Sequence, residues 1–335
     1  MKLQKLKKKR IMLLQKPGRL RRTSFLRNLI RETRLSVDDL IRPIFVTPHN
    51  KRLELESMPG QFYFPLDKIE KTIEETMKLG INGIILFGSA KIKDDMATET
   101  INENGIIQQT VRKIRQSFPE LIIITDACFC QYTTHGHCGI LDINGSIDRN
   151  SSLKQLQGQT ISHVDAGADF VAPSCMIDGM VKHIRDALDD NGYEDRGILS
   201  YAIKYASAFY GPFRYAFNSS PKQGDRKSYQ MDPGNIREAI KEAQIDEDEG
   251  ADIIMVKPAL PYMDVIKEVK NQVSCPVAAY QVSGEYAMIK AAAQNNWMDE
   301  NDSMMESLLG IKRSGADIII TYFADTAARI INSRS

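Results

Sequence analysis

Three cysteines fall in one short segment of the chain that directly follows an apolar run, LIIITDA. They are Cys128, Cys130 and Cys138, with the spacing C-x-C-x7-C. Three thiolates form a soft ligand set that suits zinc, and three protein ligands with an open position are typical of a catalytic rather than a structural site. The same segment holds His135 and His137, to which we assign no ligand role. The spacing therefore predicts a catalytic zinc centre, against the alternative of a chance cluster of buried thiols.

Two lysines stand at the ends of apolar runs, Lys204 in GILSYAIK and Lys257 in IIMVKPA. A buried ammonium group is costly, so a lysine in such a position needs a reason. Pro258 favours an extended backbone at Lys257. If both amines face one cavity, each raises the cost of protonating the other, which depresses the pKa and leaves a free amine. Such an amine attacks carbonyl groups, so the pair predicts Schiff-base chemistry.

Eight short apolar runs must position these groups. They cover 41–47, 83–88, 121–128, 170–174, 197–204, 253–259, 277–283 and 318–323. Runs of this length and composition are typical of parallel strands that are buried on both faces. Amphipathic stretches lie between them, such as 67–80, in which Ile69, Ile73 and Met77 share one helix face.

The joints between helix and strand repeat one layout, with a glycine near the helix C-terminus where left-handed backbone geometry is favoured. These glycines are Gly80, Gly167, Gly250 and Gly315. Eight alternating units predict a (β/α)8 TIM barrel. A doubly wound sheet is the weaker alternative, because no G-x-G-x-x-G motif follows the first strand.

In such a barrel the chemistry lies at the C-terminal ends of the strands. The residues at those ends are Asp126, Cys128, Ser174, Lys204, Lys257, Ser283 and Tyr322. Segment 211–234, after the fifth strand, is rich in Gly, Pro and Ser and has little periodicity, which indicates a lid or binding loop. Its Arg214 and Arg226 suit the binding of a substrate carboxylate, and ordinary surface charge is the alternative.

Several long segments resemble the porphobilinogen synthase family, whose members are also called 5-aminolevulinate dehydratases. They include DACFCQYTTHGHCG (126–139), SYAIKYASAFYGPFR (200–214), GDRKSYQMDPGN (224–235), MVKPALPYMD (255–264) and YQVSGEYAM (280–288). The resemblance implies a lyase that joins two molecules of 5-aminolevulinate into porphobilinogen with loss of two waters. This is an early step of tetrapyrrole and heme biosynthesis. Because the reaction has no redox step, no nicotinamide or flavin is expected.

The resemblance also implies roles for single residues at two substrate positions, the P-side and the A-side. Lys257 would form a Schiff base with the P-side substrate and Lys204 an imine with the A-side substrate, while Asp126 and Ser174 would contact the reacting groups. The substrate-binding residues would be Arg214 and Arg226 for the A-side carboxylate, Ser283 and Tyr322 for the P-side carboxylate, and also Phe209, Tyr210 and Gln230. Cys128, Cys130 and Cys138 would ligate zinc, as in the cysteine-rich branch of the family.

The resemblance also implies a second metal site, and the chain differs from the family at two positions. Glu242, in REAIKEAQ, matches a position that holds an activating magnesium at a subunit interface in part of the family, and an ordinary surface glutamate is the alternative. Cys175 stands where the family often has an acidic residue, and Met180 where it often has arginine. Both changes would alter the charge around the active-site loops.

The N-terminus is strongly basic, since residues 1–22 contain ten Lys or Arg and no acidic residue. The rest of the chain carries 34 basic and 43 acidic residues, a net charge of −9. We predict a basic arm for oligomerisation over 1–35 and a catalytic barrel over 36–335. In the family that the chain resembles, the arm embraces a neighbouring subunit of a homo-octamer. A targeting segment, or an arm that binds nucleic acid or anionic lipid, is the alternative.

The composition, 42% hydrophobic and 26% charged residues, is typical of a globular protein with a large core. No run of eighteen apolar residues occurs, so no membrane partner is expected. Five cysteines without a secretory signal favour reduced thiols and a cytoplasmic location. Two other functions stay open. One is a class I Schiff-base aldolase on the same barrel, which needs one lysine and no thiolate zinc. The other is nucleic-acid binding through residues 1–22, although we expect no nucleic-acid partner.

Overall fold

A computed structural model describes residues 16–333, and a boundary between Arg34 and Leu35 divides the chain into two compact units. The first unit holds a 3-10 helix η1 (Pro17–Arg21) and a short helix α2 (Ser24–Leu29). The Thr23 hydroxyl caps α2 by accepting a hydrogen bond from a backbone N–H of its first turn. Phe25 and Leu29 expose their apolar side chains. The basic run at 5–10 lies outside the described residues, and the oligomerisation role of the arm stays a prediction.

The second unit contains a closed barrel of eight parallel strands, as predicted. They are β1 (Leu40–Thr47), β4 (Gly83–Gly88), β5 (Ile122–Ala127), β6 (Phe170–Pro173), β7 (Gly197–Lys204), β8 (Ile253–Lys257), β9 (Val277–Gln281) and β10 (Ile318–Thr321). Each strand pairs with the next along the chain, and β10 pairs with β1 to close the barrel. Every residue of β4, β7 and β9 is buried, which explains why these runs show no alternation of apolar and polar residues.

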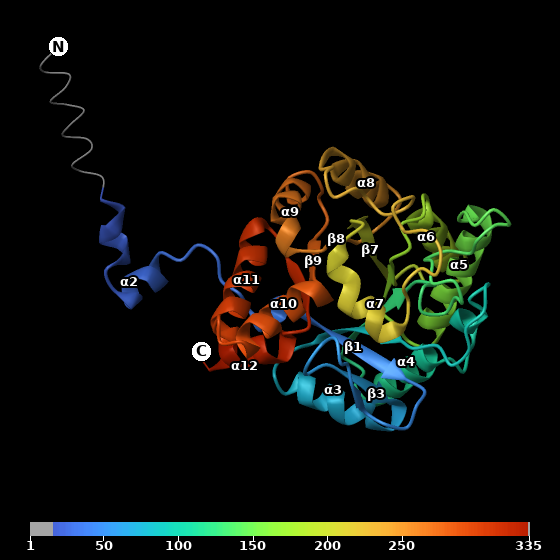
Figure 1. Cartoon of the computed structure of the whole chain (residues 1–335), viewed down its shortest axis with the longest axis horizontal. Helices are drawn as coiled ribbons and strands as arrows, with labels where there is room; N and C mark the ends of the chain where they lie inside the picture. Colours follow the sequence, from blue (N-terminus) through green and yellow to red (C-terminus); the bar gives the residue numbers. More distant parts are fainter. Residues whose placement is uncertain (1–15, 334–335) are drawn as a thin grey trace, which may run out of the picture. The chain divides into compact units, whose positions relative to one another are not determined.

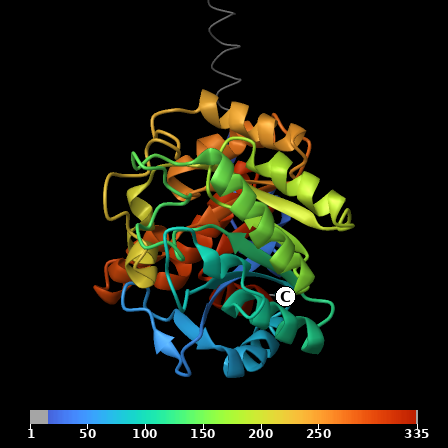
Figure 2. The ribbon, with the colours of Figure 1, turned by 90° about the vertical axis from the view of Figure 1, so that its right-hand side faces the viewer.

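Helices surround the strands (Figure 1), and the same outer layer is seen from a second direction in Figure 2. They are α3 (Ile69–Met77), α4 (Ile106–Ser117), α5 (Arg149–Asp165), α6 (Met180–Asp190), α8 (Arg237–Asp248), α9 (Met263–Lys270), α10 (Ser283–Gln294), α11 (Glu300–Ser314) and α12 (Ala324–Asn332). Short 3-10 helices lie at η2 (Val37–Asp39), η3 (Leu66–Lys68), η4 (Thr98–Ile101), η5 (Ala208–Tyr210) and η6 (Leu260–Tyr262). Among the described residues, no helix is long and apolar enough to cross a membrane.

The predicted helix faces and helix ends are confirmed. Ile69 and Ile73 are fully buried on the inner face of α3. The four glycines predicted at helix-to-strand joints all have positive φ, between 83° at Gly80 and 119° at Gly315. A side chain would be strained in this backbone conformation, so glycine lets each helix end and the chain turn toward the next strand.

Three elements around the barrel were not predicted. An antiparallel pair, β2 (Leu53–Glu54) and β3 (Phe62–Pro65), extends the sheet beside β1, and both strands are too short to show a pattern in the sequence. Segment 211–234 is also not irregular throughout, because it begins with the helix α7 (Gly211–Phe217). Pro212 in the first turn favours this helix, since proline is well tolerated there. The Tyr63 hydroxyl of β3 donates a hydrogen bond to the carbonyl of Ala216 and so connects β3 to α7.

Candidate active site

Lys204 and Lys257 are direct partners in the register of β7 and β8. Because neighbours in register point to the same side of a parallel sheet, both amines face the barrel interior at its C-terminal end. The two side chains are 5% and 9% exposed. The structure therefore brings together the two lysines that the sequence places 53 positions apart.

A β-bulge in β7 creates this pairing. The register between β7 and β8 shifts between Ser200 and Ile203, where β7 contains one residue more than its partner. Tyr201 and Lys204 are three positions apart, so a regular strand would place them on opposite faces. With the bulge, both lie inside the barrel, where the Tyr201 ring centre is 5.6 Å from the Lys204 Nζ.

Aromatic rings surround the amine of Lys257. Its Nζ lies 4.3 Å from the ring centre of Tyr280, 4.8 Å from Tyr201, 5.5 Å from Tyr210 and 5.8 Å from Phe213. Rings attract a cation through their faces, but they also exclude water from it. Burial dominates, and together with the charge of Lys204 it lowers the pKa of Lys257 to about 7. Lys257 is thus largely a free amine slightly above neutral pH.

Lys204 behaves differently, and the prediction that both lysines have a depressed pKa is wrong for it. Burial lowers the pKa of Lys204, but the thiolates of the cysteine cluster and the carboxylate of Asp126 outweigh this and raise it above the ordinary value. The Lys204 Nζ also donates a hydrogen bond to the carbonyl of Ser174. The two amines therefore differ: Lys257 loses its proton readily near neutral pH, whereas Lys204 stays charged.

Asp126 lies near the end of β5, beside Ser174 just after β6. Burial, followed by the nearby Cys128 thiolate, raises the pKa of Asp126 to about 7, against the opposing effect of the two lysines and a hydrogen bond with Ser174. A carboxyl group with this pKa exchanges protons readily at neutral pH. Asp126 is therefore suited to move protons next to both amines.

The pKa of Lys257 has a measurable consequence. We expect the rate at which borohydride traps a small keto acid on Lys257 to rise about tenfold from pH 6 to pH 8, because the neutral fraction of an amine with a pKa near 7 rises from about a tenth to about nine tenths. Above pH 8 the rate should level off. Mass spectrometry of the trapped chain gives the rate, and a rise of about tenfold for every pH unit from 6 to 9 would instead indicate an ordinary lysine.

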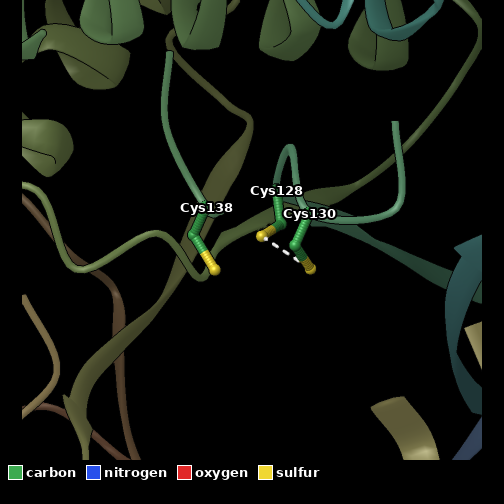
Figure 3. A group of neighbouring side chains, drawn as sticks. All are labelled: Cys128, Cys130 and Cys138. Atoms are coloured by element: carbon green, nitrogen blue, oxygen red, sulfur yellow. Dashed lines mark hydrogen bonds between the residues drawn. The ribbon is translucent and has the colours of Figure 1, made fainter. Parts of the chain in front are cut away.

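The three predicted cysteines converge at one point (Figure 3). Their Sγ atoms all lie within 4.8 Å of one another, and those of Cys128 and Cys130 are 3.6 Å apart. Tetrahedral zinc with Zn–S bonds of about 2.3 Å needs sulfurs about 3.8 Å apart. Hydrogen bonds from the thiols of Cys130, Cys138 and Cys175 hold the pKa of Cys128 well below its usual range, so the cluster already favours a thiolate. The donor set fits zinc in both spacing and chemistry.

Cys175 is a fourth buried thiol beside this cluster. Its Sγ donates to the carbonyl of Ala127, 3.7 Å away, and burial raises its pKa well above the ordinary value. The loop 128–138 that carries the three cysteines is called the metal loop here. Within it, the ring nitrogens of His137 contact the Tyr229 hydroxyl and the Gln223 carbonyl, at 3.1 and 3.0 Å. His137 therefore fastens the metal loop to the segment after α7.

Arg226 makes a second connection between these loops. Its Nη2 donates to the carbonyl of Gly136 in the metal loop and to that of Ser219 after α7. The arginine is buried, as is the Gln230 amide, whose nitrogen and oxygen have no hydrogen-bond partner among residues 16–333. Arg226 and His137 thus hold the segment after α7 against the metal loop at several points.

One cavity collects most of the predicted site residues. It is lined by Asp126, Cys128, Cys130, Ser174, Lys204, Tyr210, Arg214, Arg226, Lys257, Ser283 and Tyr322. The space left between them is about 30 Å³, little more than one water molecule requires. Lysines, carboxyl group, thiols and arginines therefore share one narrow site.

Comparison with known proteins identifies the family. The family model described as delta-aminolevulinic acid dehydratase matches residues 14–330. The chain belongs to the delta-aminolevulinic acid dehydratase family. A delta-aminolevulinic acid dehydratase from Halalkalibacterium halodurans is 51% identical over 315 residues, which cover 94% of this chain and 96% of the relative. One from Synechocystis is 51% identical over 318 residues, 94% of this chain and 97% of the relative.

A crystal structure leads to the same family. It is the delta-aminolevulinic acid dehydratase (porphobilinogen synthase) of Toxoplasma gondii in complex with the reaction product porphobilinogen. The two structures agree with a TM-score of 0.94 at 40% identity, over 96% of this chain and 92% of that chain. The predicted family, barrel fold and enzyme class, a dehydratase among the lyases, are confirmed.

Some residues around the site of this delta-aminolevulinic acid dehydratase family member were not predicted. Phe87, Gln131, Phe213 and Val282 line the cavity, and Tyr201 and Tyr280 lie against Lys257. Apolar and aromatic residues at strand ends give no signal of chemistry, because most such residues only pack in cores. Position within a strand near a lysine is the one clue that the sequence offers.

Glu242 lies apart from the cysteine and lysine cluster. It is on α8 and lines another cleft together with Asp178, Glu238, Asp246 and Glu249. Burial, and then the negative charges of Asp178 and Glu238, raise the pKa of Glu242. Carboxylates that repel one another in this way fit a divalent cation with oxygen ligands.

Proposed function

We propose that the chain condenses two molecules of 5-aminolevulinate into porphobilinogen, with Lys257 and Lys204 as the amines that bind the two keto groups. The observation that carries the proposal is the pairing of these lysines, whose pKa values are shifted in opposite directions, in a cavity lined also by Asp126 and the thiols of Cys128 and Cys130. A class I aldolase would need only the first of these amines and would make no use of the thiol cluster.

The neutral amine of Lys257 attacks the keto carbon of the P-side substrate, and the carbonyl oxygen leaves as water. Asp126, whose pKa is about 7, supplies and removes protons at this carbon and at the nitrogen. The protonated Schiff base that forms withdraws electrons and acidifies the adjacent carbon, which prepares it for carbon–carbon bond formation. The aromatic rings around Lys257 exclude water that would hydrolyse the Schiff base.

The A-side substrate binds Lys204, whose ammonium group first has to lose a proton. Arg214 and Arg226 hold its carboxylate, while Ser283 and Tyr322 hold the carboxylate of the P-side substrate. Fixing two identical molecules in different orientations supplies much of the rate, because the encounter then costs no further entropy. Cys128, Cys130 and Cys138 would hold zinc, which supplies a Lewis acid with an open coordination position when bound.

The activity is tested directly with 5-aminolevulinate as the substrate. The expected product has the mass of two substrate molecules less two waters. Chelation should abolish its formation, and added zinc should restore it. Formation that persists in zinc-free buffer would show that the metal is not part of the reaction, whereas a product that keeps both waters would favour the aldolase-type reaction.

The second metal, the assembly and the location belong to the same proposal. Glu242 would help to hold magnesium between subunits, and the basic arm would embrace a neighbouring copy in a homo-octamer. The free state of all five cysteines supports a reducing, cytoplasm-like compartment. Nucleic-acid binding through the arm would show as a steep salt dependence in a DNA-binding assay, and we expect none.

We expect magnesium to raise the melting temperature of the wild-type protein and to favour its largest assembly, since it removes repulsion among the carboxylates around Glu242. Glu242→Gln should lose most of this response. Thermal melts and light scattering with and without magnesium give both readouts. Glu268→Gln, on the exposed side of α9, is the matched control and should respond as the wild type does. An unchanged response in Glu242→Gln would contradict the assignment.

A further inference from the structure

Glu285 is a fully buried carboxylate that the proposed reaction does not use. It is the third residue of α10, and one of its oxygens, Oε2, accepts a hydrogen bond of 2.5 Å from the N–H of Val282 at the start of the same helix. Glutamate at this position commonly caps its own helix in this way. Helix capping accounts for the hydrogen bond to Oε2 but does not explain the contact made by the other oxygen, Oε1.

The second oxygen contacts a different segment, the 3-10 helix η6 that follows β8. Oε1 accepts a hydrogen bond of 2.5 Å from the N–H of Leu260, three residues after Lys257. Val282 directly precedes Ser283. One carboxylate therefore joins the segment that carries the reactive amine to the segment that carries a serine of the proposed P-side carboxylate site.

The two residues before Glu285 contact the segment that follows β7. The Ser283 hydroxyl accepts from the N–H of Phe213, at 3.1 Å, and lies 3.3 Å from the carbonyl of Phe209, to which it donates. At Gly284, a Cβ atom would lie 2.6 Å from that same carbonyl oxygen, so only glycine allows this approach. Residues 283–285 thus contact both the segment 209–213 and the chain after β8.

Both hydrogen bonds to Glu285 come from backbone donors, so both oxygens must be acceptors. Burial raises the pKa of Glu285 to about 7, while backbone N–H groups and the charge of Lys257 act in the opposite direction. A glutamine would present its NH2 group to one of the two N–H donors. An aspartate is one methylene shorter and cannot span both segments at the same separation.

We propose that Glu285 is a positioning residue that sets the separation between the Lys257 amine and Ser283, and thereby selects the chain length of the keto acid bound on the P-side. The inference rests on the proposed function. A keto acid that forms a Schiff base at one end and binds through its carboxylate at the other fits only if its length matches this separation. One methylene too many or too few then costs about tenfold or more in binding.

The test compares three keto acids that differ in the distance between carbonyl and carboxylate and do not lose the carboxylate on imine formation: 2-oxopropanoate, 4-oxopentanoate and 5-oxohexanoate. Borohydride traps each on Lys257, and mass spectrometry over a concentration series gives the apparent affinity. In the wild type, 4-oxopentanoate should bind at least about tenfold better than the other two, because it has the spacing of 5-aminolevulinate. In Glu285→Asp and Glu285→Gln, we expect this preference to fall below about threefold while the adduct still forms on Lys257.

The matched control is Asp299→Ala. Asp299 caps the neighbouring helix α11 by accepting from the N–H of Asp302, but it contacts no residue of the site. This variant loses a helix cap of the same kind and should keep the wild-type preference. The ratio of affinities does not depend on the folded fraction, and the near-isosteric Glu285→Gln provides the comparison if Glu285→Asp folds poorly.

Two failures are distinguishable. If the wild type forms no adduct with any keto acid, the proposed function is wrong. If the wild type discriminates by chain length and both Glu285 variants discriminate equally well, the function stands, Glu285 only stabilises the helix start, and the inference is overturned.

Discussion

Replacing Lys257 by alanine is expected to lower the rate of porphobilinogen formation by about 10⁴-fold or more, since removal of a covalent nucleophile commonly has effects of this size. The amine of Lys257 lies within about 6 Å of four ring centres, whereas that of Lys204 lies as near only to the ring of Tyr201 among the described residues. The measurement is product formation from 5-aminolevulinate, together with mass spectrometry after borohydride trapping. The wild type should carry a covalent adduct on Lys257, and the variant should carry none there.

Lys267→Ala is the control for this prediction, because Lys267 is exposed on α9 and should be replaceable without effect. Lys257→Met fills the space of the side chain and guards against a collapsed pocket. Lys204→Ala should still form the adduct at Lys257 but turn over slowly, because only one of the two substrates is then held covalently. Near-normal turnover in either Lys257 variant would refute the assigned role.

Cys130→Ser is expected to remove most of the bound zinc and to lower turnover by about 100-fold or more, the scale that a Lewis acid contributes to such a reaction. The serine hydroxyl remains protonated at neutral pH, so it replaces a soft anionic ligand with a poor one. Elemental analysis of the purified protein and the rate of product formation, measured on the same sample, test the two losses together.

Cys275→Ser is the matched substitution elsewhere in the chain. Cys275 lies just before β9, and burial raises the pKa of its thiol to about 11, so it is an unreactive thiol far from the C-terminal ends of the strands. Zinc content and turnover should both be unchanged. If Cys130→Ser keeps full activity in zinc-free buffer, the thiol cluster has a structural role and the metal is not part of the reaction.

The barrel and the reactive side chains could be predicted from the sequence because each rests on a local signal. The apolar run before Lys204 predicts a strand that is buried on both faces. The spacing of Cys128, Cys130 and Cys138 indicates a metal loop without knowledge of the fold. The positive-φ glycines at the helix ends follow from the same local reasoning.

Other features depend on contacts between distant segments and could not be predicted. Nothing near Lys204 in the sequence shows that the thiolates raise its pKa, because the cysteines come from two strands away. The ring of Tyr280 reaches Lys257 from β9, and Glu285 reaches Leu260 from α10. Short elements such as β2 and α7 were missed because few residues carry their pattern.

The single extra residue in β7 has a meaning for anyone who wishes to rebuild this chemistry in another protein. Copying Lys204 and Lys257 onto a barrel of regular strands would not reproduce the site, because Tyr201 and Lys204 would then diverge to opposite sides of the wall. The β-bulge itself has to be copied into the new strand, although the extra residue contributes only backbone and no reactive group. In this barrel the reactive pair is a property of strand geometry as much as of side-chain identity.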